Sequence, residues 1–170
     1  MAIAMTTGYS QQTEGALLCI NEALDWALIC VEQLKKDSHH LIVDYGAADG
    51  GTAINLWNLV LDRLHKVQPM AHLTLVGNDL PSNNNQALAE NLALQIDRKP
   101  NPTVLVSSRS FYSQVVAPKS VSFGFSATAM HWLSKSPCKL KNHTHVQASD
   151  NIEVFKLFRL QAIKDWELLL

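Results

Sequence analysis

Cysteine, net charge and long apolar runs are all scarce in this 170-residue sequence. The three cysteines, Cys19, Cys30 and Cys138, are widely separated, with no CxxC pair and no partner cluster. We therefore expect three reduced thiols that take part in packing, not a disulfide framework. The formal net charge of -1 gives no electrostatic reason to expect nucleic acid or an anionic membrane as a partner.

Signals for membrane insertion or export are also missing. The longest apolar runs fall well short of the roughly 20 residues that a membrane-spanning helix needs. The opening Met-Ala-Ile-Ala-Met has neither a basic start nor the long apolar core of a secretory signal. We expect a cytoplasmic protein whose partner is a small molecule or another protein, with 170 residues sufficient for one domain with a real core.

Hydrophobic spacing predicts alternating helices and strands along most of the chain. A strand, a helix and a second strand follow one another between residues 41 and 79, and this βαβ pattern predicts parallel strands. Before the first strand, His39 and His40 could be metal ligands, but adjacent side chains entering a strand point to opposite faces, so we expect turn residues. Helices are expected at about 17–34, 52–67, around 88–96 and at 151–170, strands at 41–44, 72–79, 103–106 and 120–126, and a polar loop at 137–150.

The sequence Asp44-Tyr-Gly-Ala-Ala-Asp-Gly-Gly51 follows the first strand and is the strongest candidate for a ligand site. Such a turn places small side chains and exposed backbone N–H groups at the carboxyl end of a strand, where open α/β sheets bind ligands. A dinucleotide site would need G-x-G-x-x-G and a P-loop would need G-x-x-x-x-G-K-[ST], and the turn has neither spacing. It matches D-x-G-x-x-x-G, the first motif of class I methyltransferases. Asp79, which ends the next strand, suits a ribose diol.

Three further segments make the resemblance more specific. Asn78-Asp-Leu-Pro81 resembles the N-D-L-P signature of the SABATH family of small-molecule carboxyl and N-methyltransferases. Ser110-Phe-Tyr112 is similar to the family's S-F-Y segment, and His131-Trp-Leu-Ser134 to its [HM]-W-L-S segment. The weaker patterns near both ends, around Tyr9-Ser10 and residues 152–165, also fit, so the resemblance covers nearly the whole chain. It implies a three-layer, Rossmann-like α/β fold with strand order 3-2-1-4.

The resemblance also implies a binding site for S-adenosylmethionine, whose demethylated product is S-adenosylhomocysteine. Gly46 would line the turn, Asp79 would hold the ribose hydroxyls, Leu80 would pack on the adenine, and Ser110 and Phe111 would complete the adenine pocket. Thr13 stands where the family has a serine near the amino acid end of the cofactor. The other residues that we assign to the cofactor site are Tyr9, Asp44, Asp49 and Ser126.

On the substrate side, the resemblance implies Trp132, His131 and Thr128. The indole N–H of Trp132 matches the family's donor to the substrate carboxylate, and indole is a donor only. The family's glutamine and its common aromatic residue are replaced by Ala16 and Thr128. Simpler roles remain for several of these residues: Trp132 and Phe111 as core aromatics, Asp44 and Asp49 as turn formers, and His131 as a satisfied histidine.

The resemblance implies methyl transfer to a small carboxylic acid without a catalytic acid–base residue or a metal. We expect one domain over residues 1–170, made of an N-terminal segment and helix (1–37), a core (38–135), and a loop with the start of a cap or closing helix (136–170). Family members are longer, so the remaining strands and a helical cap are expected to be missing from this sequence. The alternative is a truncated, catalytically silent module that retains cofactor affinity. An open edge at the fourth strand predicts a homodimer or another chain that covers it.

Overall fold

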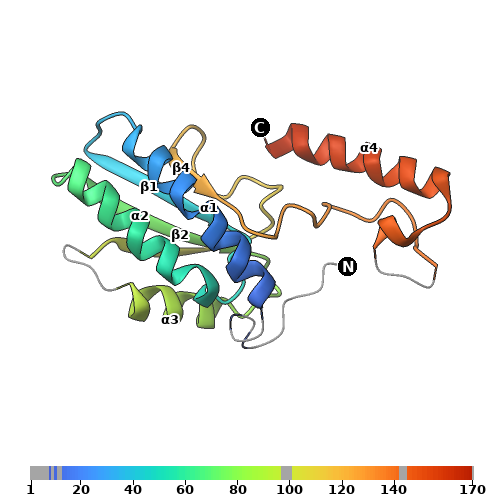
Figure 1. Cartoon of the computed structure of the whole chain (residues 1–170), viewed down its shortest axis with the longest axis horizontal. Coiled ribbons are helices and arrows are strands. Elements are labelled where there is room, and N and C mark those ends of the chain that lie inside the picture. The colour runs from blue at the N-terminus through green and yellow to red at the C-terminus, as the bar shows by residue number, and fades with distance from the viewer. Residues whose placement is uncertain (1–7, 9, 11–12, 97–100, 142–144, 170) are drawn as a thin grey trace. The chain divides into compact units, whose positions relative to one another are not determined.

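The computed structural model describes residues 8, 10, 13–96, 101–141 and 145–169. Between Met130 and His131 the chain divides into two compact units. Figure 1 follows the chain from helix α1, in blue, to helix α4, in red. The elements of the first unit are α1 (Glu14–Glu32), β1 (His39–Tyr45), the 3-10 helix η2 (Gly51–Ala53), α2 (Ile54–Val67), β2 (His72–Asp79), α3 (Asn85–Gln95), β3 (Thr103–Ser108) and β4 (Val121–Phe125).

The four strands form one parallel sheet in the order β3-β2-β1-β4. The predicted α/β class and strand order are therefore confirmed. The strand from His72 to Asp79 has the predicted bounds, while β3 continues two residues further, to Ser108. Because all strands run in the same direction, their carboxyl ends meet at one edge of the sheet.

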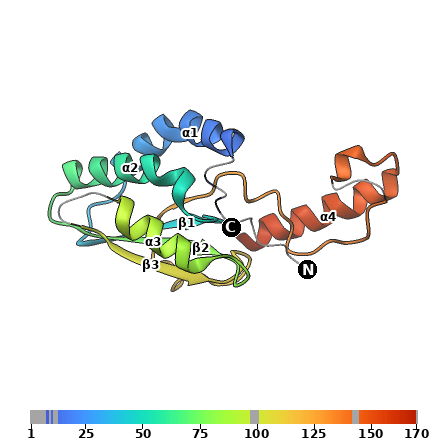
Figure 2. The same cartoon turned by 90° about the horizontal axis from the view of Figure 1, so that it is seen from below.

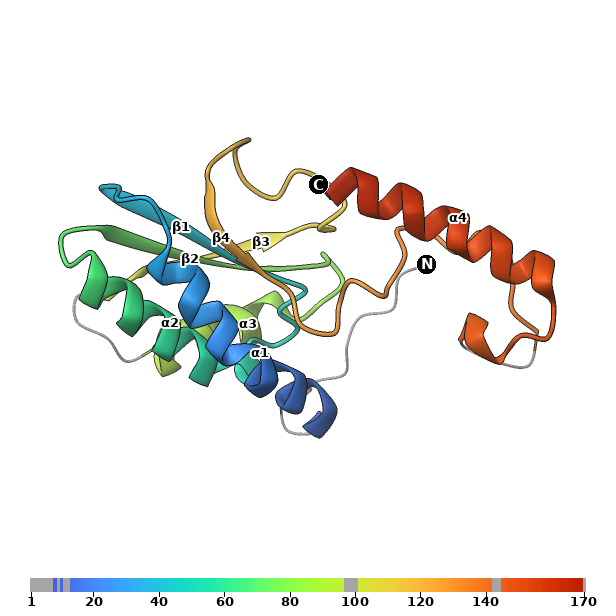
Figure 3. The same ribbon diagram turned by 45° about the horizontal axis from the view of Figure 1, so that its top comes forward.

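Helices α1, α2 and α3 lie on the same face of this sheet (Figures 2 and 3). Two layers of the predicted three-layer arrangement are thus present within the first unit. On the opposite face of β3, Leu105 is 51% exposed. Among the described residues, no helix is long and apolar enough to cross a membrane.

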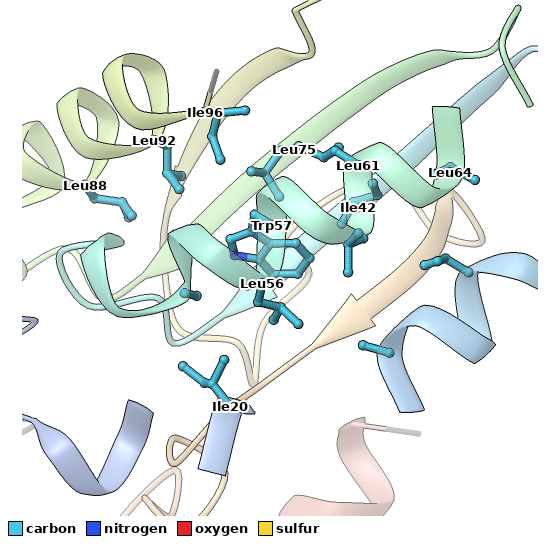
Figure 4. Packing of buried hydrophobic residues seen from close by; sticks show 14 residues of the cluster. Ile20, Ile42, Leu56, Trp57, Leu61, Leu64, Leu75, Leu88, Leu92 and Ile96 are labelled. Atoms are coloured by element: carbon cyan, nitrogen blue, oxygen red, sulfur yellow. The ribbon is translucent and has the colours of Figure 1, made fainter. Parts of the chain in front are cut away.

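The core between the helices and the sheet is centred on Trp57 of α2 (Figure 4). Its indole ring packs edge-on against Phe123 and Phe125 of β4, with ring centroids 6.4 Å and 5.8 Å apart. Such edge-to-face contacts add to the energy of burial alone. Strand β1 lies between β2 and β4 in the sheet. The other large, fully buried side chains that share this core include Ile42, Leu56, Leu61, Leu64, Leu75, Leu88 and Leu92.

Helix α1 is amphipathic as expected, but its outer face differs from the prediction. Ile20, Ala27 and Val31 are buried, whereas Trp26 is 72% exposed. Cys19 and Cys30 are free and exposed, so the expectation that these thiols take part in packing was wrong for both. They lie on the side of α1 turned away from the core, because the buried stripe runs through the residues three or four positions apart from Ile20 to Val31.

His39 and His40 belong to β1 and not to a turn, so that prediction was wrong. Their backbones pair in register with His72 and Leu73 of β2. The two side chains point to opposite faces, as alternation along a strand requires: His39 is exposed and His40 is buried. The polar side chain of His40 can be buried because it has a hydrogen-bond partner: its Nε2 lies 3.0 Å from Oε1 of Gln68.

The second unit contains the 3-10 helix η3 (Val146–Ala148) and helix α4 (Ile152–Leu169). Helix α4 matches the predicted closing helix, and η3 places one helical turn within the predicted polar loop. The side chains buried along α4 are Gln161 and Asp165, while Phe155, Ile163 and Trp166 are exposed. This helix therefore buries a polar pair and presents apolar side chains outward.

Candidate cofactor site

The predicted cofactor residues of the first unit come from the carboxyl ends of the four strands. Gly46 directly follows β1, Asp79 ends β2, Ser110 follows β3 and Ser126 follows β4. The strand register brings these ends to one level, since Tyr45 pairs with Asn78, Asp79 with Ser108, and Asp44 with Phe125. The sequence rule that placed the site at this edge of the sheet thus matches the topology.

The sequence predicted exposed backbone N–H groups in the glycine turn, but the structure shows them bound within the protein. The N–H groups of Gly46 and Ala47 both donate to the backbone oxygen of Asn78, at 2.9 Å and 3.0 Å. Ala48 N–H donates to Oδ2 of Asp79 at 2.6 Å. Gly50 N–H donates to Ala47 O, and Gly51 N–H to the Asp49 carboxylate. These five N–H groups are therefore bound within the protein, three of them to Asn78 and Asp79 of β2 and two within the turn.

Gly46 is required by its conformation and by its neighbours. Its φ is +77°, a left-handed value that glycine adopts without strain. A Cβ at this position would overlap the Cβ of Ala129 and lie 3.7 Å from Cε1 of Phe111. Ala48 also has a positive φ, +52°, in the same turn, an uncommon conformation for a residue with a side chain. Gly46 therefore brings the chain after β1, the loop after β3 and the segment after β4 into close contact.

Asp79 is half-buried, and its carboxylate is the principal acceptor at this edge of the sheet. Oδ2 accepts the N–H of Ala48, and Oδ1 accepts the N–H of Leu80 at 2.7 Å. An ionised carboxylate has about four lone-pair positions, so these two bonds leave capacity for two more donors. Asp79 can thus hold the turn in place and still accept a pair of hydroxyl groups.

Asp44, at the end of β1, lies in a different environment. It is 3% exposed, and its Oδ2 accepts the indole N–H of Trp57 at 2.8 Å. Burial raises the pKa of the Asp44 carboxyl to about 7, the hydrogen bond from Trp57 lowers it in part, and the nearby charge of Asp79 raises it. Asp44 therefore faces the core, where it joins the end of β1 to α2.

The loop after β3 carries the predicted adenine residues. Ser110 and Phe111 are half-buried, and Oγ of Ser110 accepts the N–H of Tyr112 at 3.2 Å. The rings of Phe111 and Tyr112 lie 4.6 Å apart, between centroids, in a tilted arrangement. After β4, Oγ of Ser126 donates to the backbone oxygen of Tyr45 at 2.8 Å, which joins the ends of β4 and β1.

The N-terminal segment reaches the turn through Ser10. Both the backbone N–H and the hydroxyl of Ser10 donate to Oδ2 of Asp49, at 3.1 Å and 3.0 Å. Asp49 is therefore occupied by Ser10 and Gly51, as a turn-forming residue would be. Thr13 directly precedes α1. Tyr9 lies outside the described residues.

The three predicted substrate residues fall on both sides of the boundary between the units. Thr128 is in the first unit, exposed, with a positive φ of +53°. His131 and Trp132 open the second unit, with their ring centroids 5.2 Å apart, and Trp132 is 55% exposed.

Within the second unit, the segment that carries Trp132 is tied to α4. Ser134 donates its N–H and its hydroxyl to Asp165, at 2.8 Å and 2.6 Å, and the amide of Gln161 donates to both residues. Burial alone would raise the pKa of Asp165, but the hydrogen bonds from Ser134 and Gln161 outweigh it and hold the pKa below its usual range. Gln161 and Asp165 lie in the weaker C-terminal pattern, whose role the sequence did not reveal.

A set of asparagines around the turn was not predicted as part of the site. Asn83 and Asn91 donate to the backbone oxygens of Ala48 and Asp49, at 2.6 Å and 2.7 Å. Asn85 donates to Leu80 O and to Oγ of Ser108. Asn84 caps α3, since its side chain accepts the N–H of Ala87 at the start of that helix. The density of asparagine between residues 78 and 91 was the available signal.

The fold is that of a solved methyltransferase. The structure of loganic acid methyltransferase with SAH matches with a TM-score of 0.78 and 18% sequence identity, covering 99% of this chain and 53% of that one. At this identity the match establishes the fold, in which the parallel sheet of this chain is shared with that methyltransferase.

Sequence comparison then gives the family. Residues 9–170 match the family described as SAM dependent carboxyl methyltransferase, and the chain belongs to this family. The resemblance to SABATH enzymes is thereby confirmed. Methyltransferase FUS9 of Gibberella fujikuroi is 33% identical over 56% of this chain and 28% of that protein. Salicylate/benzoate carboxyl methyltransferase of Arabidopsis thaliana is 30% identical over 69% of this chain and 32% of that protein. This chain thus spans about a third of these relatives and about half of the solved structure.

The chemistry of the described groups fits the nucleoside part of S-adenosylmethionine, the methyl donor on which the family depends. Asp79 has acceptor capacity for a ribose diol, and Leu80 and Phe111 offer apolar and aromatic surface beside it. The turn N–H groups are already used within the protein, so a ligand carboxylate would need donors from elsewhere.

Proposed function

We propose that this chain binds S-adenosylmethionine and directs its methyl group to the carboxylate of a small organic acid. One observation carries the proposal: Asp79, the Gly46 turn and the Ser110–Phe111 loop meet at the ends of three adjacent strands. Membership of the SAM dependent carboxyl methyltransferase family supports S-adenosylmethionine as the ligand of this site.

The protein's part in this reaction would be positioning. The bound cofactor supplies a methyl group on a sulfonium, and a carboxylate is a competent nucleophile at neutral pH without a general base. Orientation of reacting groups can supply about 7 kcal/mol or more of the barrier reduction. Asp79 would fix the ribose, Leu80 and Phe111 would enclose the adenine, and Gly46 would let the backbone approach the ligand.

For the acceptor, we propose that Trp132 donates its indole N–H to the substrate carboxylate, with His131 and Thr128 beside the substrate. The donor-only chemistry of indole supports this role, because an anionic oxygen is the partner that it suits. Ala16 is buried and has no side-chain amide. This supports a mode of binding the substrate carboxylate that differs from that of family members with a glutamine at this position.

A second candidate function keeps the Asp79 site and lacks methyl transfer. In this alternative the protein binds the cofactor but transfers no methyl group. The two functions share the Asp79 site and differ only in the acceptor side, so they can be separated by experiment.

We propose that the protein forms a homodimer. Among the described strands, β4 is an edge strand that pairs only with β1, and an open edge can recruit a second chain. The outward apolar side chains of α4 provide further surface for association. A cytoplasmic location is also proposed, supported by the free and exposed thiols of Cys19 and Cys30, which suit a reducing compartment.

Isothermal titration with S-adenosylhomocysteine tests cofactor binding. Asp79→Ala should weaken binding by about 10- to 100-fold, because hydrogen bonds to a charged group contribute about 1.5–3 kcal/mol. Asp37→Ala is a matched control, since Asp37 is an exposed carboxylate at the opposite end of the sheet, before β1. No heat of binding with the intact protein, or an unchanged affinity in Asp79→Ala, would refute the proposed site. Thermal unfolding without ligand shows whether each variant is folded.

A methylation assay with salicylate, benzoate and other small acids separates the two functions. Transfer to any acid supports the enzyme, and its loss in Trp132→Phe, which keeps the aromatic ring but removes the N–H, would support the role of that indole. Binding of S-adenosylhomocysteine with no transfer to any acid supports the silent module.

A further inference from the structure

Asn78, the second-last residue of β2, connects the three segments that form the candidate cofactor site. Its backbone oxygen accepts the N–H groups of Gly46 and Ala47 in the glycine turn. Its side-chain Nδ2 donates to the backbone oxygens of Ser107 and Arg109, at 2.9 Å and 2.8 Å. The residue that follows it is Asp79. One side chain thus holds the loop after β3, while its backbone holds the turn after β1.

The side-chain contacts require an asparagine. Any residue at position 78 could offer the backbone oxygen, but among uncharged side chains only a primary amide presents two N–H groups from one nitrogen to two carbonyl oxygens. Aspartate has the same shape and would place an acceptor against both carbonyls. Glutamine would push the amide further along the loop by one methylene.

Asn78 is not optimised for stability alone. It is 0% exposed, and its Oδ1 has no hydrogen-bond partner among the described residues. A buried, unsatisfied acceptor costs about 1–3 kcal/mol. Asparagine is also disfavoured inside strands. A residue that carries both penalties at a strand end suggests a demand for the particular geometry that its two donors impose.

That geometry determines where Ser110 and Phe111 lie. The two carbonyls that Asn78 binds come just before these residues, and the loop beyond them is closed by Arg109, whose guanidinium donates to Gln114 O at 2.6 Å. Phe111 packs close to Gly46, whose N–H is bound by the backbone of Asn78. Asn78 therefore determines the distance between the glycine turn and the Ser110–Phe111 loop.

We propose that Asn78 is a positioning residue for adenine recognition: its amide fixes the Ser110–Phe111 loop against the glycine turn. This role rests on the proposed binding of S-adenosylmethionine. It differs from that of Asp79, because Asn78 acts through the loop and need not touch the ligand.

The test measures the affinities of S-adenosylhomocysteine and S-ribosylhomocysteine, which lacks the adenine, for wild type and for Asn78→Asp. The variant should lose about tenfold or more in affinity for S-adenosylhomocysteine, and less than about threefold for S-ribosylhomocysteine. Asn78→Ser, which removes the fork without adding charge, should show the same change and serves if the aspartate variant does not fold. Asn58→Ala is the control: its amide donates to Gln95 O, away from the site, and the ratio of the two affinities should remain that of wild type.

The outcomes separate this inference from the proposed function. If wild type binds no S-adenosylhomocysteine, the proposed function fails and the role of Asn78 fails with it. If wild type binds but both folded Asn78 variants keep the wild-type ratio of the two affinities, the positioning role alone is overturned. Equal losses for the two ligands would show a general structural role and would also overturn it.

Discussion

Because the carboxyl of Asp44 is buried, we expect the stability of the protein to depend on pH. Its pKa in the folded protein, about 7, lies above its value in an unfolded chain, so the folded state holds a proton that the unfolded state releases between these values. The contribution of Asp44 to the free energy of unfolding is fully present below about pH 4 and is lost as the pH rises through about 7. Asp44→Asn keeps an acceptor for the Trp57 indole and carries no charge at any pH.

We therefore expect the stability advantage of Asp44→Asn over wild type to grow from about pH 4 to about pH 8. Urea unfolding at several pH values in this range measures it. Asp37→Asn provides the comparison, because Asp37 is exposed and its pKa is lowered, chiefly by the backbone hydrogen bond from Ser38, so its effects fall in acid. Parallel curves for wild type and Asp44→Asn would contradict the environment described for Asp44.

Single residues also show where sequence reasoning succeeds and where it stops. Gly46 and Asp79 were predicted as cofactor residues from the strand-end pattern together with the family resemblance. Both lie at the carboxyl ends of strands, as the hydrophobic spacing predicted. The inward hydrogen bonds of the turn were not foreseen, because they depend on the backbone path, including the left-handed Ala48. The role of Asn78 also depends on a contact between residues about thirty positions apart, which no local pattern records.

Among the elements, the corner where α1 and α2 approach the amino end of β1 depends on one side chain. Gln68, just after α2, is buried; its Oε1 accepts the N–H of Asp37 and lies within hydrogen-bonding distance of His40 Nε2. Its amide lies 3.4 Å from the oxygens of Leu34 and Lys35. The corner lies at the amino ends of the strands, opposite the candidate site.

Gln68→Leu should lower the free energy of unfolding by about 1–3 kcal/mol, because it leaves buried polar groups unpaired. The affinity for S-adenosylhomocysteine should not change in the folded variant. Gln86→Leu, at an exposed position of α3, should alter stability by less than about 0.5 kcal/mol. Chemical denaturation and titration calorimetry provide the two measurements, and equal losses of stability in both variants would contradict the prediction.

The elements differ in how far the sequence specifies them. β2 has the predicted bounds because a largely apolar run, from Leu73 to Gly77, is bordered by polar residues. β1 begins earlier than expected, because pairing with β2 and the contact to Gln68 compensate two histidines that are weak strand signals. For α1, the helical period was clear, but the sequence left open which part of a broad apolar face would be buried, and Cys19 and Cys30 lie outside it.

For the molecule as a whole, the proposed homodimer is directly testable by size-exclusion chromatography with light scattering. Wild type should have the mass of two chains. Ser122→Lys should weaken the dimer if the β4 edge pairs, since a lysine on an edge strand discourages strand addition. Ile163→Lys should weaken it if the apolar face of α4 is the contact. A wild-type protein that stays monomeric at high concentration would exclude the dimer.

The closed turn after β1 has a further consequence for discrimination among cellular nucleotides. A site that binds ATP commonly cradles phosphates with free backbone N–H groups. Here the N–H groups of Gly46, Ala47, Ala48, Gly50 and Gly51 are all engaged with oxygens of the protein itself. A triphosphate would meet occupied amides and the carboxylate of Asp79 in this turn, whereas an adenosine that carries a sulfonium has no phosphate that needs amide donors. The hydrogen bonds that hold the turn together thus disfavour the binding of ATP, the most abundant adenine nucleotide of the cell.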